Sequence, residues 1–153
     1  MRLQFVALAV GALVLSLAAG CGGGGKADLP KLVPVSGTVT LDGKPLAGAM
    51  VSFIPTGATP GRSMFYGATG ADGRYELVYD EKHKGAPEGQ FMVLCNKWVM
   101  PDGSDFPRDS KVAPMDGGAR ELLPPRYSLD GTSELRATVK AGGPPIDFKL
   151  TSK

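Results

Sequence analysis

Hydrophobic and polar residues alternate with a period of two along much of the chain after residue 34. In residues 35–41, for example, Val35, Gly37, Val39 and Leu41 are separated by serine and threonine. Such alternation indicates a β-strand with one buried face, because successive side chains of a strand point to opposite sides. By the same pattern we expect seven strands, at residues 35–41, 49–53, 62–69, 74–79, 90–98, 134–140 and 146–150.

Turn residues separate most of these strands. Asp42-Gly43 and Asp72-Gly73 are two-residue turn signals, since glycine readily adopts the positive φ that tight turns need. No segment of this part shows a convincing helical period, so we expect an all-β fold, a seven-stranded antiparallel β-sandwich. Residues 99–133 are the exception. They are rich in Pro, Gly and Asp and too long for an ordinary connection, so they should either pack across the sandwich or be partly mobile.

Residues 1–20 have the layout of a secretory signal helix. Arg2 is their only charged residue, residues 5–17 are apolar except for one glycine and one serine, and small residues follow. A buried core helix is one alternative, which the glycines at 22–25 disfavour. A permanent membrane-spanning helix is another, which would need about 20 apolar residues.

The next residues resemble the lipobox of bacterial lipoproteins. Ala18, Ala19, Gly20 and Cys21 occupy its four places, with Ala18 where the family usually has leucine. The resemblance implies signal cleavage between Gly20 and Cys21, a thioether-linked diacylglycerol on Cys21, and acylation of the new amino terminus. Two or three acyl chains on one residue bind a membrane stably, whereas a single chain is marginal. We expect no cofactor beyond this covalent lipid.

Residues 21–34 would then be the lipidated cysteine and a flexible tether, because glycines there have no side chains to pack. The expected location is the cell envelope, lipid-anchored and facing the periplasm or the exterior. Gly22 stands where some bacteria place an aspartate for inner-membrane retention, which favours the outer membrane by analogy. Loss of residues 1–20 lowers the net charge from +2 to +1, so the acyl chains must supply the membrane affinity.

Three further motifs resemble the carboxypeptidase regulatory-like, transthyretin-type β-sandwich domain. They are VSGTVTLDGKPLAGAMVSFIP at residues 35–55, GATGADGRYEL at 67–77 and GAPEGQFMVLC at 85–95. The resemblance implies that residues 35–153 form one Greek-key sandwich of the transthyretin (prealbumin) type. It brings no active site with it.

Candidate chemistry is sparse. His83, the only histidine, lies in a run of polar and charged residues that is typical of a solvated loop, and no G-x-S-x-G motif occurs. Asp80, Glu81 and His83 match neither zinc nor calcium spacing, so we expect no metal. Lysine and arginine are scattered, which makes nucleic acid an unlikely partner. Cys95 has no cysteine to pair with once Cys21 is acylated, so we expect a small apolar core residue.

One surface favours an interaction. If alternate residues from Phe91 to Cys95 point inward, then Met92, Leu94 and Trp98 share the opposite face, which either the long following segment or another molecule must cover. We therefore expect a non-enzymatic, membrane-anchored binding or structural module, with the bilayer and an envelope protein or glycan as partners. A carbohydrate- or peptide-binding accessory protein is the alternative, followed by a hydrolase of unfamiliar geometry.

Overall fold

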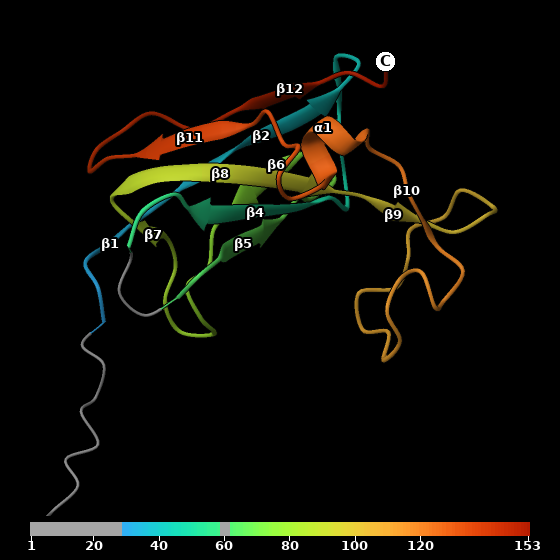
Figure 1. Ribbon diagram of the computed structural model, residues 1–153, viewed down its shortest axis with the longest axis horizontal. Helices are drawn as coiled ribbons and strands as arrows, with labels where there is room; N and C mark the ends of the chain where they lie inside the picture. Colours follow the sequence, from blue (N-terminus) through green and yellow to red (C-terminus); the bar gives the residue numbers. More distant parts are fainter. Residues whose placement is uncertain (1–28, 59–61) are drawn as a thin grey trace, which may run out of the picture.

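The computed structural model describes residues 29–58 and 62–153. They form an almost entirely β structure with a single one-turn helix (Figure 1). Each of the seven expected strands is present in at least part of its predicted range. The remaining five strands have two residues each and were not expected from the pattern.

Two four-stranded sheets make up the body. The first, here called the β8 sheet, has the order β11 (Arg136–Val139), β8 (Gly89–Asn96), β4 (Met50–Pro55) and β5 (Phe65–Ala68). All neighbouring strands within this sheet pair in the antiparallel direction. These strands join segments far apart in the sequence, so the sheet depends on long-range pairing.

The second, here called the β2 sheet, is centred on β2 (Ser36–Leu41). One edge of β2 pairs with β12 (Phe148–Leu150), and its other neighbours are β3 (Lys44–Pro45) and β6 (Arg74–Glu76). The β2–β12 pair is parallel, so the expectation of a purely antiparallel arrangement is wrong there. The chain reaches β12 from the end where β2 begins: Ile146 N–H donates to Ser36 O at 2.8 Å, and two residues later β12 starts opposite Val39 and runs in the same direction as β2.

The two sheets face each other across one hydrophobic core. The Phe53 ring of β4 lies 6.1 Å from the Phe148 ring of β12 and 6.3 Å from the Tyr75 ring of β6, centroid to centroid. Within its own sheet Phe53 lies 5.7 Å from Phe91. Both Phe53 and Phe91 are fully buried, and each such side chain contributes about 1.5–3 kcal/mol to folding. The inward-facing residues predicted for β4 and β8 are confirmed: Val51, Phe53, Phe91, Val93 and Cys95 are all buried.

The folded body begins earlier than the sequence pattern suggests. β1 (Leu32–Val33) pairs with β7 (Ala86–Pro87), and Val33 is buried. Two residues of the expected tether are therefore part of the structure. The polar and charged run around His83, expected to be a solvated loop, likewise leads directly into the short strand β7.

Residues 99–133 fold into two parts, a lobe beside the sheets and a return segment that packs against β8. β9 (Trp98–Val99) and β10 (Arg120–Glu121) pair with each other, and residues 100–119 between them form a lobe beside the sheets (Figure 1). The chain then returns through α1 (Pro125–Ser128), which packs against β8. Part of this segment thus covers the β8 sheet, as one of the two expectations had it.

Candidate functional site

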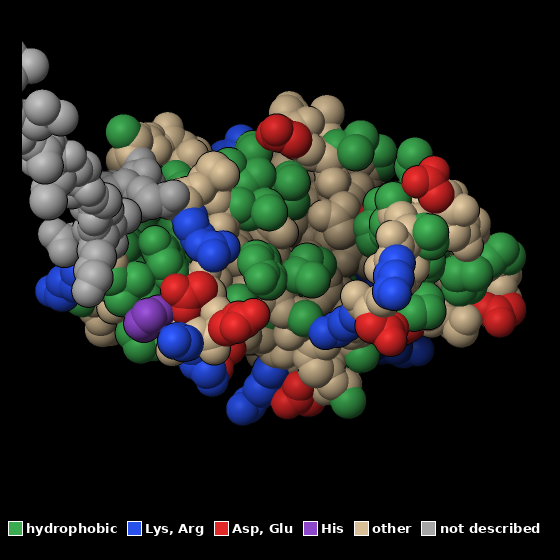
Figure 2. All heavy atoms as spheres, turned by 90° about the horizontal axis from the view of Figure 1, so that it is seen from below, with side chains coloured by type: hydrophobic (Ala, Val, Ile, Leu, Met, Phe, Trp, Pro, Cys, Tyr) green, Lys and Arg blue, Asp and Glu red, His purple; other side chains and the backbone are tan. Residues whose placement is uncertain are grey.

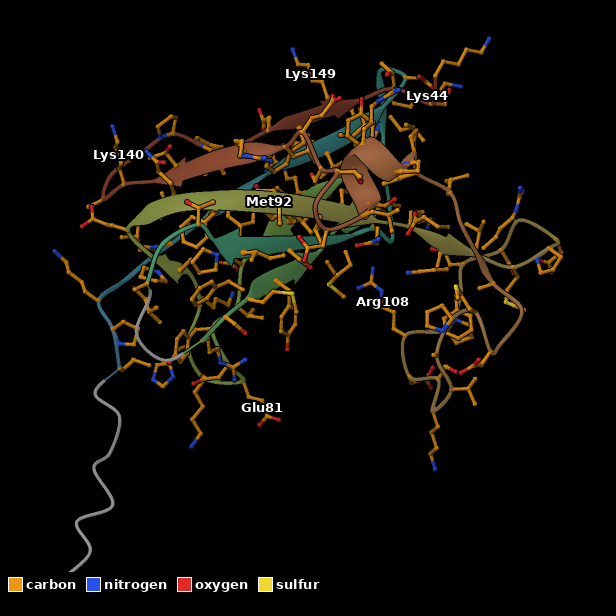
Figure 3. The ribbon with its side chains drawn as sticks, in the orientation of Figure 1. Lys44, Glu81, Met92, Arg108, Lys140 and Lys149 are labelled. Carbon is orange, nitrogen blue, oxygen red and sulfur yellow. The ribbon has the colours of Figure 1, made fainter. Side chains whose placement is uncertain are left out.

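A groove of about 250 Å³ lies between the β8 sheet and the lobe. Met50, Asn96 and Trp98 line it from the side of the sheet, and Phe106 and Arg108 line it from the lobe. Arg108 projects from the lobe toward the sheet (Figure 3). The groove is therefore mainly apolar and aromatic, with one cationic side chain.

Hydrogen bonds fix the two walls relative to each other. The backbone N–H of Phe106 donates to Trp98 O at 3.1 Å, close to where β9 begins its pairing with β10. Across the groove, Arg108 Nη2 donates to Thr69 O at 3.3 Å, just after the end of β5. The lobe is thus joined to the body at both sides of the groove.

An ion pair supports the base of the lobe. The Lys97 side chain, only 7 % exposed, has its Nζ bound to the carboxylate of Asp105, which is 60 % exposed. Gly48, with φ of +70°, lies under this pair: a β-carbon there would come within 2.6 Å of Lys97 Nζ. The absence of a side chain at Gly48 therefore leaves the space that the buried ammonium occupies.

Asn96 connects β8 to the returning chain. Its Nδ2 donates to Glu121 Oε2 and to Ser128 O, both at 2.9 Å. Glu121 Oε1 accepts from the backbone N–H of Lys97 at 2.8 Å and from that of Leu123 at 3.0 Å. The amide hydrogens of Asn96 are therefore both used inside the protein.

The outer face of the β8 sheet continues from the groove. Met92 and Leu94 are half-buried on this face, where they pair with Ile54 and Ser52 of β4. Met50 and Tyr66 are 36 % and 39 % exposed. Seen from below, hydrophobic side chains gather in the middle of the molecule and charged ones along its lower edge (Figure 2).

The three residues predicted to share one outer surface, Met92, Leu94 and Trp98, do not all lie together. Met92 lies in the middle of the sheet (Figure 3), with Leu94 next on the same face, whereas Trp98 lies beyond the end of β8 and lines the groove. Each is half covered by the protein itself. Sequence reasoning did not identify Arg108 as part of the site, because it lies in a segment without periodicity.

His83 is held in its own loop. Its Nδ1 lies 2.8 Å from Asp80 Oδ1, and the same carboxylate accepts from the backbone N–H groups of Lys82 and His83. The hydrogen bond from the His83 side chain, supported by these backbone bonds, holds the pKa of Asp80 below its usual value. The His83 side chain is 43 % exposed, and its contact with Asp80 stabilises the turn between β6 and β7.

Cys95 is completely buried in the core between the sheets. Burial raises the pKa of its thiol to about 12, and the nearby carboxylate of Glu121 acts in the same direction. A protonated, inaccessible thiol packs as a small apolar group.

Gly20 and Cys21, the predicted cleavage and lipidation residues, lie outside the described residues. Over residues 29–58 and 62–153, no group of three or more His, Cys, Asp or Glu side chains could hold a metal ion. In the same part of the chain no helix has the length and apolar character needed to cross a membrane. Comparisons with protein-family models, with curated proteins and with solved structures find no match to this chain.

Proposed function

We propose that this protein is a lipid-anchored lipoprotein of the cell envelope whose β body is a non-catalytic binding module. The observation that carries the binding role is the groove beside Trp98, which opens at the end of an apolar sheet face. Concave, largely apolar sites with a few polar groups are where proteins bind ligands. Exposed apolar surface next to such a site is also typical of interaction surfaces.

The rigidity of the groove supports the same role. Its walls are joined by the Phe106–Trp98 and Arg108–Thr69 hydrogen bonds and by the buried Lys97 ion pair. A preformed site loses little conformational entropy when a ligand binds, so more of the contact energy appears as affinity.

The anchor rests on the lipobox resemblance at Cys21. Ten residues separate Cys21 from β1, and fully extended they span at most about 35 Å. That reach would allow the body to stand clear of the lipid headgroups. The bilayer is then the first partner, with the outer membrane favoured, and the acyl groups on Cys21 are the only covalently attached non-protein groups proposed.

For the body we propose a carboxypeptidase regulatory-like domain over residues 35–153, with a Greek-key sandwich of the transthyretin type. The seven strands expected from the alternation of hydrophobic and polar residues, and their division into two facing sheets, support it. The second partner is an envelope protein or glycan that binds at the groove, and nucleic acid is not among the partners proposed.

Membrane fractionation of cells tests the anchor. The wild-type protein and a Cys95→Ala variant should sediment with membranes and be released by detergent, because both keep the lipidated residue. The Cys21→Ser variant should lack the lipid and leave the membrane-bound mature pool. Equal, detergent-sensitive membrane binding of Cys21→Ser would contradict the anchor.

Chemical cross-linking in intact cells tests the binding role. We expect a specific cross-linked species with the wild-type protein that is lost in Trp98→Ala and kept in Tyr66→Ala, which alters the sheet face away from the groove. The same cross-linked species in Trp98→Ala as in the wild type would contradict a binding role for the groove.

A further inference from the structure

The groove has the size and lining for one apolar group. Its volume of about 250 Å³ lies just below the range of roughly 300–1,000 Å³ that drug-sized ligands occupy. Trp98 and Phe106 are half-buried and offer aromatic surface, and Met50 is 36 % exposed at the same site. A single large side chain would fill such a space and exclude water from these surfaces.

The amide side chain of Asn96 and the hydroxyl side chain of Ser110, both in the groove, already use their donors. Both amide hydrogens of Asn96 are donated to Glu121 and Ser128. Ser110 Oγ donates to Val112 O at 3.2 Å. A sugar presents several hydroxyl groups that act as donors and acceptors together, and these side chains have no donors left to offer them.

Arg108, unlike Asn96 and Ser110, still has hydrogen-bond donors available in the groove. Of its five N–H groups, one donates to Thr69 O at 3.3 Å, and none forms an ion pair with a carboxylate among the residues that the structure describes. The indole N–H of Trp98 also has no hydrogen-bond partner within those residues. The spare polar groups of these two side chains are therefore donors, and one of them carries a positive charge.

We propose that the groove binds the C-terminal residue of a polypeptide whose last side chain is apolar. The side chain packs against Trp98 and Phe106, and the terminal carboxylate accepts hydrogen bonds from Arg108. A carboxylate is an acceptor-only group whose two oxygens match the planar guanidinium fork, so it suits donors that lack a partner. The inference rests on the proposed binding function and specifies its ligand class.

Trp98 makes the proposal directly measurable, because it is the only tryptophan in the chain and lines the groove. The full chain, purified in detergent, is titrated with acetyl-Gly-Gly-Leu bearing a free carboxylate and with the same peptide as its C-terminal amide. We expect a saturable change in tryptophan emission, with the free acid binding about tenfold more tightly than the amide.

Two variants assign that preference to Arg108. In Arg108→Gln the free acid should bind no more tightly than the amide, so that the preference for the acid is lost. Arg74→Gln is the matched control, because Arg74 is 80 % exposed on β6 and away from the groove, and it should keep the full preference. Both substitutions are at exposed side chains, so the fold should tolerate them.

Three outcomes would overturn the proposal: equal affinity for acid and amide, a preference that persists in Arg108→Gln, or an emission change with a neutral oligosaccharide but not with either peptide. None of them would contradict the proposed lipid anchor or the expected loss of the cross-linked species in Trp98→Ala. Failure of the ligand assignment is thus distinguishable from failure of the proposed function.

Discussion

Gly37 occupies the point where the crossing segment before β12 passes closest to β2. A β-carbon on Gly37 would overlap the carbonyl oxygen of Ile146 and approach the Tyr75 ring to 3.0 Å. The same carbonyl accepts a hydrogen bond from the Tyr75 hydroxyl at 2.7 Å, which holds the segment in place. The inward position that the alternation assigns to residue 37 is therefore filled by another part of the backbone.

Gly37→Ala should destabilise the protein by about 3 kcal/mol, because the added methyl group forces the crossing segment away from β2. Thermal or denaturant unfolding measures the loss. Gly57→Ala is the matched control: among residues 29–58 and 62–153 no heavy atom lies within 4 Å of the β-carbon that it would add, and the stability of this variant should stay near that of the wild type. Equal stability of the two variants would show that the close approach at Gly37 is not required.

Cys95 should be unreactive in the folded protein. With the thiol pKa raised to about 12, almost no thiolate exists at pH 8, and burial blocks access to what forms. A thiol reagent at pH 8 should label Cys95 only after unfolding in guanidinium chloride. Rapid labelling of Cys95 under native conditions would contradict its place in the core.

The same pKa shift implies a pH dependence of stability. The pKa of the thiol is near its ordinary value of 9.0 in the unfolded chain and about 12 in the folded protein, so its contribution to stability is complete below pH 9 and is lost as the pH rises toward 12. The difference in unfolding free energy between the wild type and Cys95→Ala should therefore shrink between pH 9 and pH 11. A constant difference over that interval would contradict the shift.

The longer strands were predictable because buried and exposed side chains alternate along a half-buried strand. In β8, Phe91, Val93 and Cys95 are buried and Met92 and Leu94 are not, as the pattern requires. The two-residue strands were not predictable, since their pairing depends on partners far away in the sequence. The parallel β2–β12 pair was missed for a related reason: alternation gives a strand its faces but not the direction of its neighbour.

The candidate site was predictable only on the side of the sheet. Trp98 was identified because it follows an alternating strand with an apolar outer face. Arg108 and Met50 were not identified, because their place in the groove depends on how residues 100–119 fold back toward the sheet. That path is set by contacts such as Lys97–Asp105, which leave no periodic signal in the sequence.

The lobe should open locally when that contact is removed. Asp105→Asn leaves the buried Lys97 ammonium without its negative partner, which disfavours the closed lobe. We expect faster hydrogen exchange at the amide of Phe106, which bonds to Trp98 O, with unchanged exchange at Val93 in β8. Asp109→Asn, at an exposed neighbouring position, is the control.

The outcome distinguishes a local from a global role. Equal exchange at Phe106 in Asp105→Asn and in the wild type would show that the ion pair does not hold the lobe. Accelerated exchange throughout β8 as well would show that lobe and sheets unfold together instead of separately.

In the proposed function, the lipid anchor and the β body of the molecule would have separate tasks. The mature chain would carry a net charge of only +1, so electrostatic attraction to anionic lipids would add little and the proposed acyl groups would have to provide the attachment. The body in turn presents its groove on the lobe side, at the far end of the β8 sheet from the β1–β7 pair where the chain enters (Figure 1). A tether at one end and a groove at the other would keep the binding surface accessible to a partner.

Mass spectrometry of the N-terminal peptide from purified membranes would show whether the protein is held there by a lipid on Cys21. We expect a mature chain that begins at Cys21, with diacylglycerol on its sulfur and an acyl group on its amino nitrogen. A membrane-derived chain with an unmodified Cys21 thiol, or one that still carries residues 1–20, would contradict it.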